Sequence, residues 1–217
     1  MSFWQITLQL LEGFGYTLVI FGVTLAAAIP LGLLIALGSM SRFRPVCVPC
    51  RGLVWIIRGT PLMLQIIVFA YGPGLWLDIP IRTIQEQMLM VCIAFAINYA
   101  CYFSEIFRGG IESISRGQYE AGQVLGMTRG QIFKNIVLLQ VIKRIVPPMS
   151  NEIITLVKDT ALANAILVSE IIMQANKLAA KAMIWPLFYA GAFYLVFVGV
   201  LTILLGKLEK KLDYFKA

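Results

Sequence analysis

An apolar stretch in the second half of this sequence is interrupted by charged, amide and hydroxyl side chains. They are Asn151, Glu152, Thr155, Lys158, Asp159, Thr160 and Asn164. In a helix, Glu152, Thr155 and Asp159 share one stripe, and Asn151, Thr155 and Lys158 share an overlapping one. Ionisable groups inside a bilayer cost at least about 2.5–3.5 kcal/mol each, so they usually face a bundle interior or a wet cavity. Two roles stay open: a polar path for a zwitterionic or charged solute, or mutual neutralisation of neighbours that fixes helix packing.

A second set of polar residues lies nearer the N-terminus. Asn98 and Glu105 are seven residues apart on one helical face, and Gln65 is a lone amide in a separate apolar run. The residues that we predict to line a substrate path are Gln65, Asn98, Glu105, Lys158, Asp159, Asn164 and Glu170. Glu170 is either a rim residue on the outer face or a ligand for a cationic group. Glu105 and Arg108 lie near the end of their apolar run, and for them a structural ion pair with the next loop is the favoured role.

The residue types give no basis for catalysis. The sequence contains no histidine, the commonest general base and metal ligand, and no G-x-x-x-x-G-K-[ST] phosphate loop. Cys47 and Cys50 form a C-x-x-C across a proline, but no strand–helix pattern supports a redox site, and the four cysteines lack metal-type spacing. We therefore expect no catalytic residue, no metal site and no cofactor bound by this chain.

The composition indicates a membrane protein. Of the 217 residues 59% are hydrophobic and 13% are charged, whereas soluble domains carry roughly a quarter charged residues. The net charge of +7 could suggest nucleic-acid binding, but that needs a basic soluble face, and here the basic residues separate apolar runs. We expect one transmembrane domain over residues 1–217 and no nucleic-acid partner.

Apolar runs of about 20 residues, the length that spans a bilayer, occur five times. They cover about Glu12–Leu37, Val46–Leu77, Ile84–Phe107, the stretch from just after Pro148 to Val168, and Ile184–Gly206. The second run contains Arg58-Gly59-Thr60-Pro61, and the fourth is predicted to begin after Pro147-Pro148. The predicted fold class is an all-α polytopic membrane protein with five transmembrane helices.

The distribution of Lys and Arg predicts the orientation, because positive residues resist translocation. Fourteen of the 18 belong to the links and tail of one side: Arg42, Arg44, Arg51, Arg58, Arg108, Arg116, Arg129, Lys134, Lys143, Arg144, Lys207, Lys210, Lys211 and Lys216. Three belong to the other side: Arg82, Lys177 and Lys181. We therefore predict an outer N-terminus and a cytoplasmic C-terminus.

The longest non-apolar interval, about residues 108–146, is then cytoplasmic. Good helix formers over residues 118–125 predict a short helix that Gly126 ends. Ala121 and Gly122 are expected to leave one side nearly bare, so that the helix lies flat in a groove of another protein. The predicted docking residues are Glu120, Ala121, Gly122 and Gly126.

This loop closely resembles a family signature. Glu120-Ala121-Gly122, Gly126 and Ile136 match the E-A-A-x3-G-x9-I-x-L-P pattern of the membrane subunits of bacterial ATP-binding-cassette (ABC) importers. The rest of the chain, from about Gly13 to Tyr214, resembles their polar amino-acid branch. Its matching stretches are Arg58–Leu62 (R-G-T-P-L), Glu105–Ile111 (E-x-x-R-G-x-I), Gly117–Glu120 (G-Q-x-E), and Pro147–Asn151 with Leu156–Thr160 (L-P-x-x-x-N…L-x-K-D-T).

Three positions depart from the family pattern. Gly122 replaces an alanine, which costs up to about 1 kcal/mol of helix propensity. Leu139 replaces the proline of the signature, so we expect Pro147 and Pro148 to break the helix instead. Ser169 stands where many relatives that carry cationic amino acids have an acidic residue, which weakens the case for arginine or lysine as cargo.

The resemblance implies a type I importer permease in the bacterial cytoplasmic (inner) membrane. Residues 120–126 would form the coupling helix, seated in a cytoplasmic ATPase dimer that holds ATP and Mg²⁺. A soluble solute-binding protein would deliver a polar amino acid outside, and a second permease subunit would complete a homodimer or heterodimer. The alternative is a stand-alone secondary carrier or channel, against which the five spans, the loop and the lack of a visible inverted repeat all argue.

Overall fold

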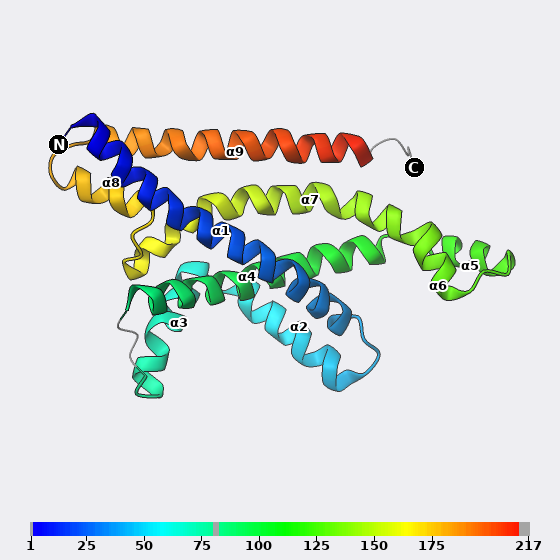
Figure 1. The fold of residues 1–217 in the computed structure, drawn as a ribbon. Coiled ribbons are helices and arrows are strands. Elements are labelled where there is room, and N and C mark those ends of the chain that lie inside the picture. Colours follow the sequence, from blue (N-terminus) through cyan, green and yellow to red (C-terminus); the bar gives the residue numbers. More distant parts are fainter. Residues whose placement is uncertain (1, 80–82, 213–217) are drawn as a thin grey trace.

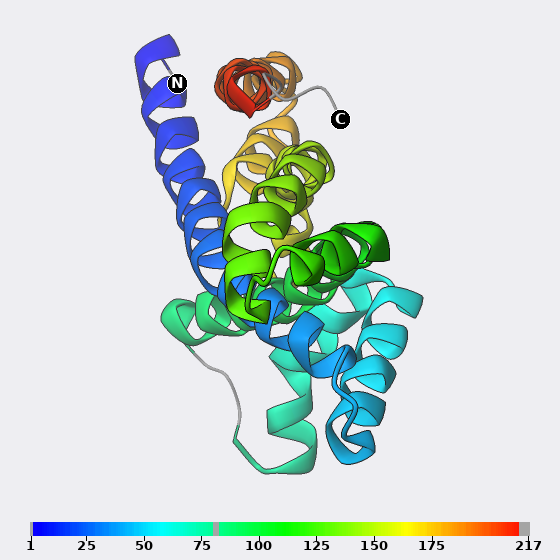
Figure 2. The same cartoon turned by 90° about the vertical axis from the view of Figure 1, so that its right-hand side faces the viewer.

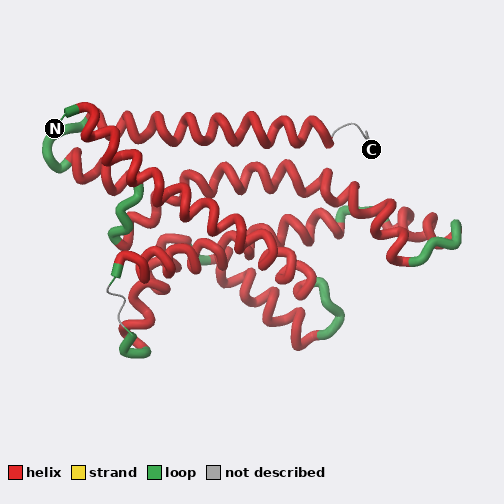
Figure 3. The backbone as a smooth tube through the Cα atoms, viewed as in Figure 1, coloured by secondary structure: helices red, strands yellow, loops and turns green. Residues whose placement is uncertain are grey.

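The computed structural model describes residues 2–79 and 83–212, and the regular structure within them is helical (Figure 3). The elements are α1 (Phe3–Ser39), α2 (Arg44–Gly59), α3 (Leu62–Trp76), α4 (Ile84–Glu112), α5 (Arg116–Val124), α6 (Arg129–Ile132), the π-helical turn η1 (Phe133–Val137), α7 (Leu138–Asp159), the 3-10 segment η2 (Thr160–Ile166), α8 (Ile171–Ala179) and α9 (Trp185–Leu212). Arg82 and Lys216 of the charge pattern, and Tyr214 of the family resemblance, lie outside the described residues.

The helix α4 is the centre of the fold, with α1, α3 and α7 packed on it (Figures 1 and 2). Of an apolar 18-residue stretch of α4, 61% is buried, against 6% in α9. The core holds Phe95, Tyr99 and Phe103 of α4 together with Ile66 of α3 and Leu156 of α7. The sequence of α4 is apolar on almost all sides, which is the pattern expected of a helix enclosed by other helices.

Close packing of α1 on α4 depends on a small residue. A Cβ atom at Gly32 would lie 2.9 Å from the carbonyl oxygen of Ala100 and 2.9 Å from Cβ of Phe103. Small residues let two membrane helices bring their backbones together, where dispersion is the main source of attraction. Gly32 thus fixes the crossing point of these two helices.

Within residues 2–79 and 83–212, three helices are long and apolar enough to cross a membrane: α1, α4 and α9. The α2–α3 pair is a fourth candidate, but it bends by 107°. The second predicted span, about residues 46–77, therefore consists of two helices that meet at a sharp bend. Thr60 has an extended backbone (φ −120°, ψ 146°), which is the conformation that a following proline imposes, here Pro61.

The fourth predicted span also differs from expectation. α7 begins at Leu138 and continues through Pro147 and Pro148, so the prolines do not break it. The irregular backbone lies on either side, in η1 before the helix and in η2 after it. Prolines inside membrane helices are tolerated where neighbouring helices and side chains re-satisfy the freed carbonyls. Charged residues along α7 interrupt its apolar character, and it is not among the three long apolar helices.

Candidate functional site

The chain between α4 and α7 folds into a small helical unit, α5–α6, beyond the ends of those helices (Figure 1). α5 occupies the predicted position, and Gly126 follows it with a left-handed backbone (φ +74°). The Gly126 amide donates to the Gln123 carbonyl at 2.9 Å, and the Met127 amide to the Gly122 carbonyl at 3.0 Å. Such bonds close a helix whose last position favours glycine. A short helix that Gly126 ends is confirmed.

The two small residues of α5 face different ways. Ala121 is exposed, but Gly122 is buried against α6, where an added Cβ would lie 2.6 Å from Cγ1 of Ile132. The expectation that both leave the outer side bare is therefore wrong for Gly122, whose missing side chain permits packing inside the loop. Glu120 is exposed, and within the described residues it forms no ion pair.

Two large apolar side chains protrude from the end of α5. Val124 is 88% exposed and Leu125 is 77% exposed. Neither residue was among the predicted docking residues. The signal in the sequence was an apolar pair directly before the glycine that ends a short polar helix. Exposed apolar side chains grouped within a polar rim are typical of interaction surfaces. The tip of α5 therefore combines an acidic residue with an apolar end.

An apolar cluster fastens α5–α6 to the long helices. Its buried members are Ile114, Ile132, Val137 and Val141, and around them pack Ile111, Tyr119, Met127, Ile136 and Ile145. The set includes residues of α4 and of α7, and Arg144 of α7 also donates a hydrogen bond to the Ser113 carbonyl at the end of α4. The α5–α6 unit is therefore packed against two long helices, α4 and α7.

Gln65 and Asn98, both predicted for the substrate path, are bound to each other. The Asn98 amide nitrogen donates to the Gln65 amide oxygen at 3.0 Å. The Gln65 nitrogen donates to the Ile57 carbonyl and to the Thr60 hydroxyl, each at 2.8 Å. Both amides are buried, so they form a clasp that holds the α2–α3 bend against α4. Contact with a solute stays a prediction for this pair.

Glu105 lies in a chain of four charged residues near the end of α4. Its carboxylate accepts from Arg108 at 3.0 and 2.6 Å and lies 3.5 Å from the Arg58 guanidinium. Arg108 also bonds Glu112 at 2.8 Å, and Arg58 stacks on Tyr102 at 5.1 Å. Glu105 and Arg108 pair with each other within α4, and Arg58 connects this group to α2. In the described part of the chain neither residue forms the predicted ion pair with the chain after α4.

Asp159 is paired with a residue that the sequence analysis did not select. Its Oδ2 accepts a hydrogen bond from the Tyr99 hydroxyl at 2.7 Å, while Lys158 is exposed and forms no ion pair in the described part of the chain. Neutralisation of Lys158 by Asp159 through direct contact is therefore not seen. Nothing in the spacing around Asp159 pointed to Tyr99, which is 60 residues away.

The remaining polar residues of α7 form an open stripe. Asn151 and Lys158 are exposed, and Glu152, Thr155 and Asp159 are half-buried. These positions fall on one side of a helix. Asn164 in η2 is half-buried too. This stripe is the polar surface that the structure leaves accessible along a long helix.

Glu170 is fully buried, which is not the position of a rim residue. Its two carboxylate oxygens accept from the amides of Ile172 and Met173, each at 2.7 Å. Because the first amides of a helix lack intrahelical partners, an acidic residue there caps the helix and meets its positive end. In this structure Glu170 starts α8, and a role as ligand for a cation stays a prediction.

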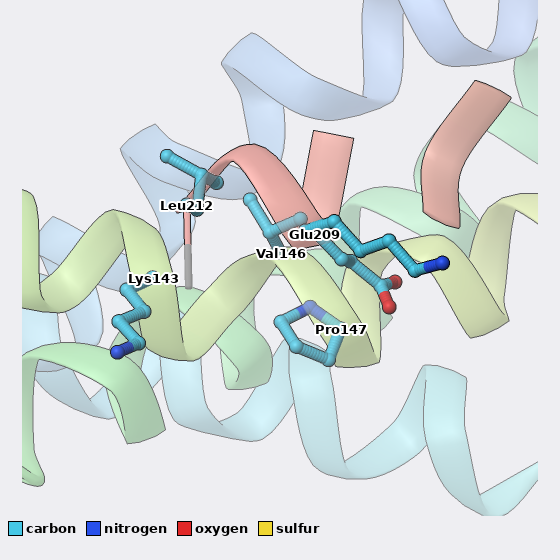
Figure 4. A pocket seen from close by; sticks show the side chains of 6 residues that line it. Lys143, Val146, Pro147, Glu209 and Leu212 are labelled. Atoms are coloured by element: carbon cyan, nitrogen blue, oxygen red, sulfur yellow. The ribbon is translucent and has the colours of Figure 1, made fainter. Parts of the chain in front are cut away.

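Two of the pockets along the long helices have charged residues in their lining. One, of about 290 Å³, lies between α7 and α9; Lys143 and Glu209 extend to opposite sides of it (Figure 4), so these two charges do not converge on a ligand. The other, of about 570 Å³, lies between α2 and α4 and is lined by Arg51, Val54, Trp55, Arg58, Gly59, Glu105 and Arg108. Its charged side chains do converge.

Comparison with known proteins gives a consistent result. Residues 28–213 match the family model described as "Binding-protein-dependent transport system inner membrane component". The chain is 35% identical to an arginine transport system permease protein of Bacillus subtilis (strain 168), over 94% of this chain and 92% of that protein. It is 33% identical to the L-cystine transport system permease protein of the same organism, over 100% and 90%. An octopine transport system permease protein of Rhizobium radiobacter is 35% identical, over 95% and 86%.

Solved structures agree with the sequence relatives. A crystal structure of an amino acid ABC transporter superposes with a TM-score of 0.86 at 28% identity, covering 97% of this chain and 99% of that chain. An inward-facing methionine ABC transporter has a TM-score of 0.71 at 15% identity, over 98% and 99%, and supports the fold alone. The chain therefore belongs to the family of binding-protein-dependent transport system inner membrane components, among the permease subunits of amino-acid ABC transporters.

Proposed function

We propose that this permease subunit forms half of a path for a polar amino acid and is driven through α5 by a cytoplasmic ATPase dimer. The chain is not an enzyme; hydrolysis of ATP belongs to the partner ATPase. The observation that carries the proposal is the apolar cluster that joins α5–α6 to both α4 and α7. Movement of the ATPase at α5 would reach α7, where Asn151, Glu152 and Lys158 face outward from the helix.

In this proposal α5 is the coupling helix. Glu120, Ala121 and the apolar pair Val124 and Leu125 are exposed and form the docking surface. Gly122 and Gly126 act indirectly, since the first seats α5 on α6 and the second ends the helix. An apolar tip beside a carboxylate suits a groove with an apolar floor and a basic rim.

The five proposed spans are α1, the bent α2–α3 pair, α4, α7 with η2, and α9. In Figure 1 the N-terminus and α8 lie at one end of the long helices, and α5–α6 with the end of α9 lie at the other. The second end carries the positive loop and tail, which supports an outer N-terminus and a cytoplasmic C-terminus. The proposed location is the bacterial inner membrane.

The proposed partners follow from the family. They are an ATPase dimer that binds ATP and Mg²⁺, a second permease subunit, either identical or similar, and an extracytoplasmic solute-binding protein. The polar groups along α7 suit a zwitterionic or charged cargo, and the relatives support an amino acid. The family match argues against the stand-alone secondary carrier or channel.

A charge reversal at the docking surface tests the proposal. Glu120→Lys should lower ATP-driven uptake by at least about tenfold, because a like-charge contact at an interface costs several kcal/mol. Uptake of labelled amino acid is measured in vesicles that contain the permease, its ATPase and its binding protein. Gln118→Lys, an exposed position on the same helix, is the matched control. Normal uptake by Glu120→Lys, or uptake without the ATPase, would contradict the proposal.

A further inference from the structure

The cleft between α2 and α4 contains more arginine than its carboxylates neutralise. Arg51, Arg58 and Arg108 line it, against Glu105 alone. Its volume of about 570 Å³ falls in the range of roughly 300–1,000 Å³ typical of small-molecule sites. The cleft therefore has the size and the charge of a site for an anion.

The hydrogen bonds show which guanidinium groups are available. Each of the three nitrogens of Arg108 already donates to Glu105 or Glu112, at 2.6–3.0 Å. Arg51 uses only Nε, which donates to the Ser39 carbonyl at 3.0 Å. Arg58 has one nitrogen 3.5 Å from Glu105 and is otherwise stacked on Tyr102. In the part of the chain that the structure describes, the other donors of Arg51 and Arg58 have no protein acceptor.

The spacing brings those donors together. Arg51 and Arg58 are seven residues apart in α2, two helical turns, so their side chains leave the same face. Glu105 is not available to bind a cation, because Arg58 and Arg108 already lie against its carboxylate oxygens. Guanidinium groups bind carboxylate and phosphate through paired, charge-assisted hydrogen bonds.

The remaining wall of the cleft is apolar. Val54 and Trp55 lie beside the arginines, and Trp55 is 79% exposed. An exposed indole next to guanidinium groups with unused donors is a suitable surface for the carbon part of a small organic anion. A bare inorganic anion would leave that wall unused.

We propose that Arg51 and Arg58 bind the carboxylate of an amino acid at the cytoplasmic mouth of the path, with Trp55 against its side chain. The inference rests on the proposed function for its placement on the cytoplasmic side. The group that this site would bind is an oxyanion. The phosphate of an anionic lipid headgroup is the other source of such a group. An amino acid bound at this position has already crossed the membrane, so the site would bind the released product of transport.

The test measures binding of a minimal carboxylate to the whole importer, without nucleotide, in nanodiscs of phosphatidylcholine. The probes are acetate and its uncharged isostere acetamide, observed by saturation-transfer difference NMR. We expect a signal for acetate that clearly exceeds that of acetamide, and an affinity at least about tenfold weaker in Arg51→Gln, because a hydrogen bond to a charged group is lost. Arg51→Lys should retain part of the binding.

Two controls isolate the site. Arg44→Gln removes an exposed arginine one heptad earlier in α2 that does not line the cleft, and it should bind acetate normally. Arg58→Gln should also weaken binding. If loss of its contact with Glu105 prevents folding, Arg51→Gln decides alone, because the one bond of Arg51 is to a backbone carbonyl.

Three outcomes would overturn the inference. These are equal signals for acetate and acetamide, an acetate signal that Arg51→Gln leaves unchanged, and loss of the acetate signal when phosphatidylglycerol is added, which would assign the site to a lipid headgroup. The proposed function is tested separately by uptake. An importer with ATPase-dependent uptake but no arginine-dependent acetate binding would reject this site and leave the proposed function standing.

Discussion

At the scale of single residues, the hydroxyl of Tyr99 is the partner that keeps the Asp159 carboxylate in place. The bond is 2.7 Å long, and Tyr99 is almost fully buried. Tyr99→Phe should lower the free energy of unfolding by about 1–3 kcal/mol, because a half-buried carboxylate loses its donor. Denaturant unfolding of the purified complex in detergent measures the change. Tyr102→Phe, which keeps a neighbouring ring, should change stability little, and equal losses in both variants would contradict the assignment.

Gly122 is the second residue with a specific steric role. Gly122→Val directs its side chain into Ile132, whose Cγ1 would lie 2.6 Å from the new Cβ, so α5 must shift from α6. Overpacking a tight site costs about 1–3 kcal/mol, which corresponds to a fall in uptake of at least about tenfold. We expect ATP hydrolysis to continue. Gly117→Ala, on the same helix, is the control, because the nearest atom to an added Cβ there is 4.0 Å away. Coupled uptake at the normal rate by Gly122→Val would refute the role.

Residue types and helical spacing were enough to single out the polar residues within apolar runs, but not the side chains that they contact. The partners of Asp159, Gln65 and Gly122 come from other elements, and spacing within one helix carries no information about them. Gln65 and Asn98 are 33 positions apart, so only the packing of α3 on α4 brings them together. By contrast, the stop at Gly126 is local and was predictable from the chain alone.

At the scale of elements, the clasp between Gln65 and Asn98 holds the 107° bend of α2–α3. Gln65→Leu should destabilise the importer by about 1–3 kcal/mol, because the Ile57 carbonyl and the Asn98 amide lose their partner in a buried setting. Thermal unfolding measures it. The double variant Gln65→Leu/Asn98→Leu should lose less than the sum of the single variants, since it leaves no unpaired amide. Strict additivity would show that the two amides are not coupled.

The elements themselves were predicted unevenly, for physical reasons. Apolar length identified α1, α4 and α9, because a bilayer span needs about 20 apolar residues. Length could not show the bend at Thr60-Pro61 within a run that is apolar on both sides. Nor could it show that α7 continues through Pro147 and Pro148, since whether a membrane helix tolerates a proline depends on its packed surroundings.

At the scale of the whole molecule, the proposed orientation places the α3–α4 connection outside and α5–α6 inside. A fluorescent protein that matures only in the cytoplasm, fused after Asp78, should therefore give no signal. The same reporter fused after Met127 should fluoresce. Whole-cell fluorescence, corrected for the amount of fusion protein, is the measurement, and the reverse pattern would invert the topology.

The turn η1 has a geometric consequence for the path. At Phe133–Val137 the chain uses one residue more than an α-helical turn, and the Leu138 amide reaches back to the Phe133 carbonyl. Each residue of an α-helix advances its phase by about 100°. The angular setting of Asn151, Glu152 and Lys158 against α5, the proposed docking helix, therefore depends on a single inserted residue. A one-residue deletion there would rotate the hydrophilic side of α7 by about 100° relative to α5–α6.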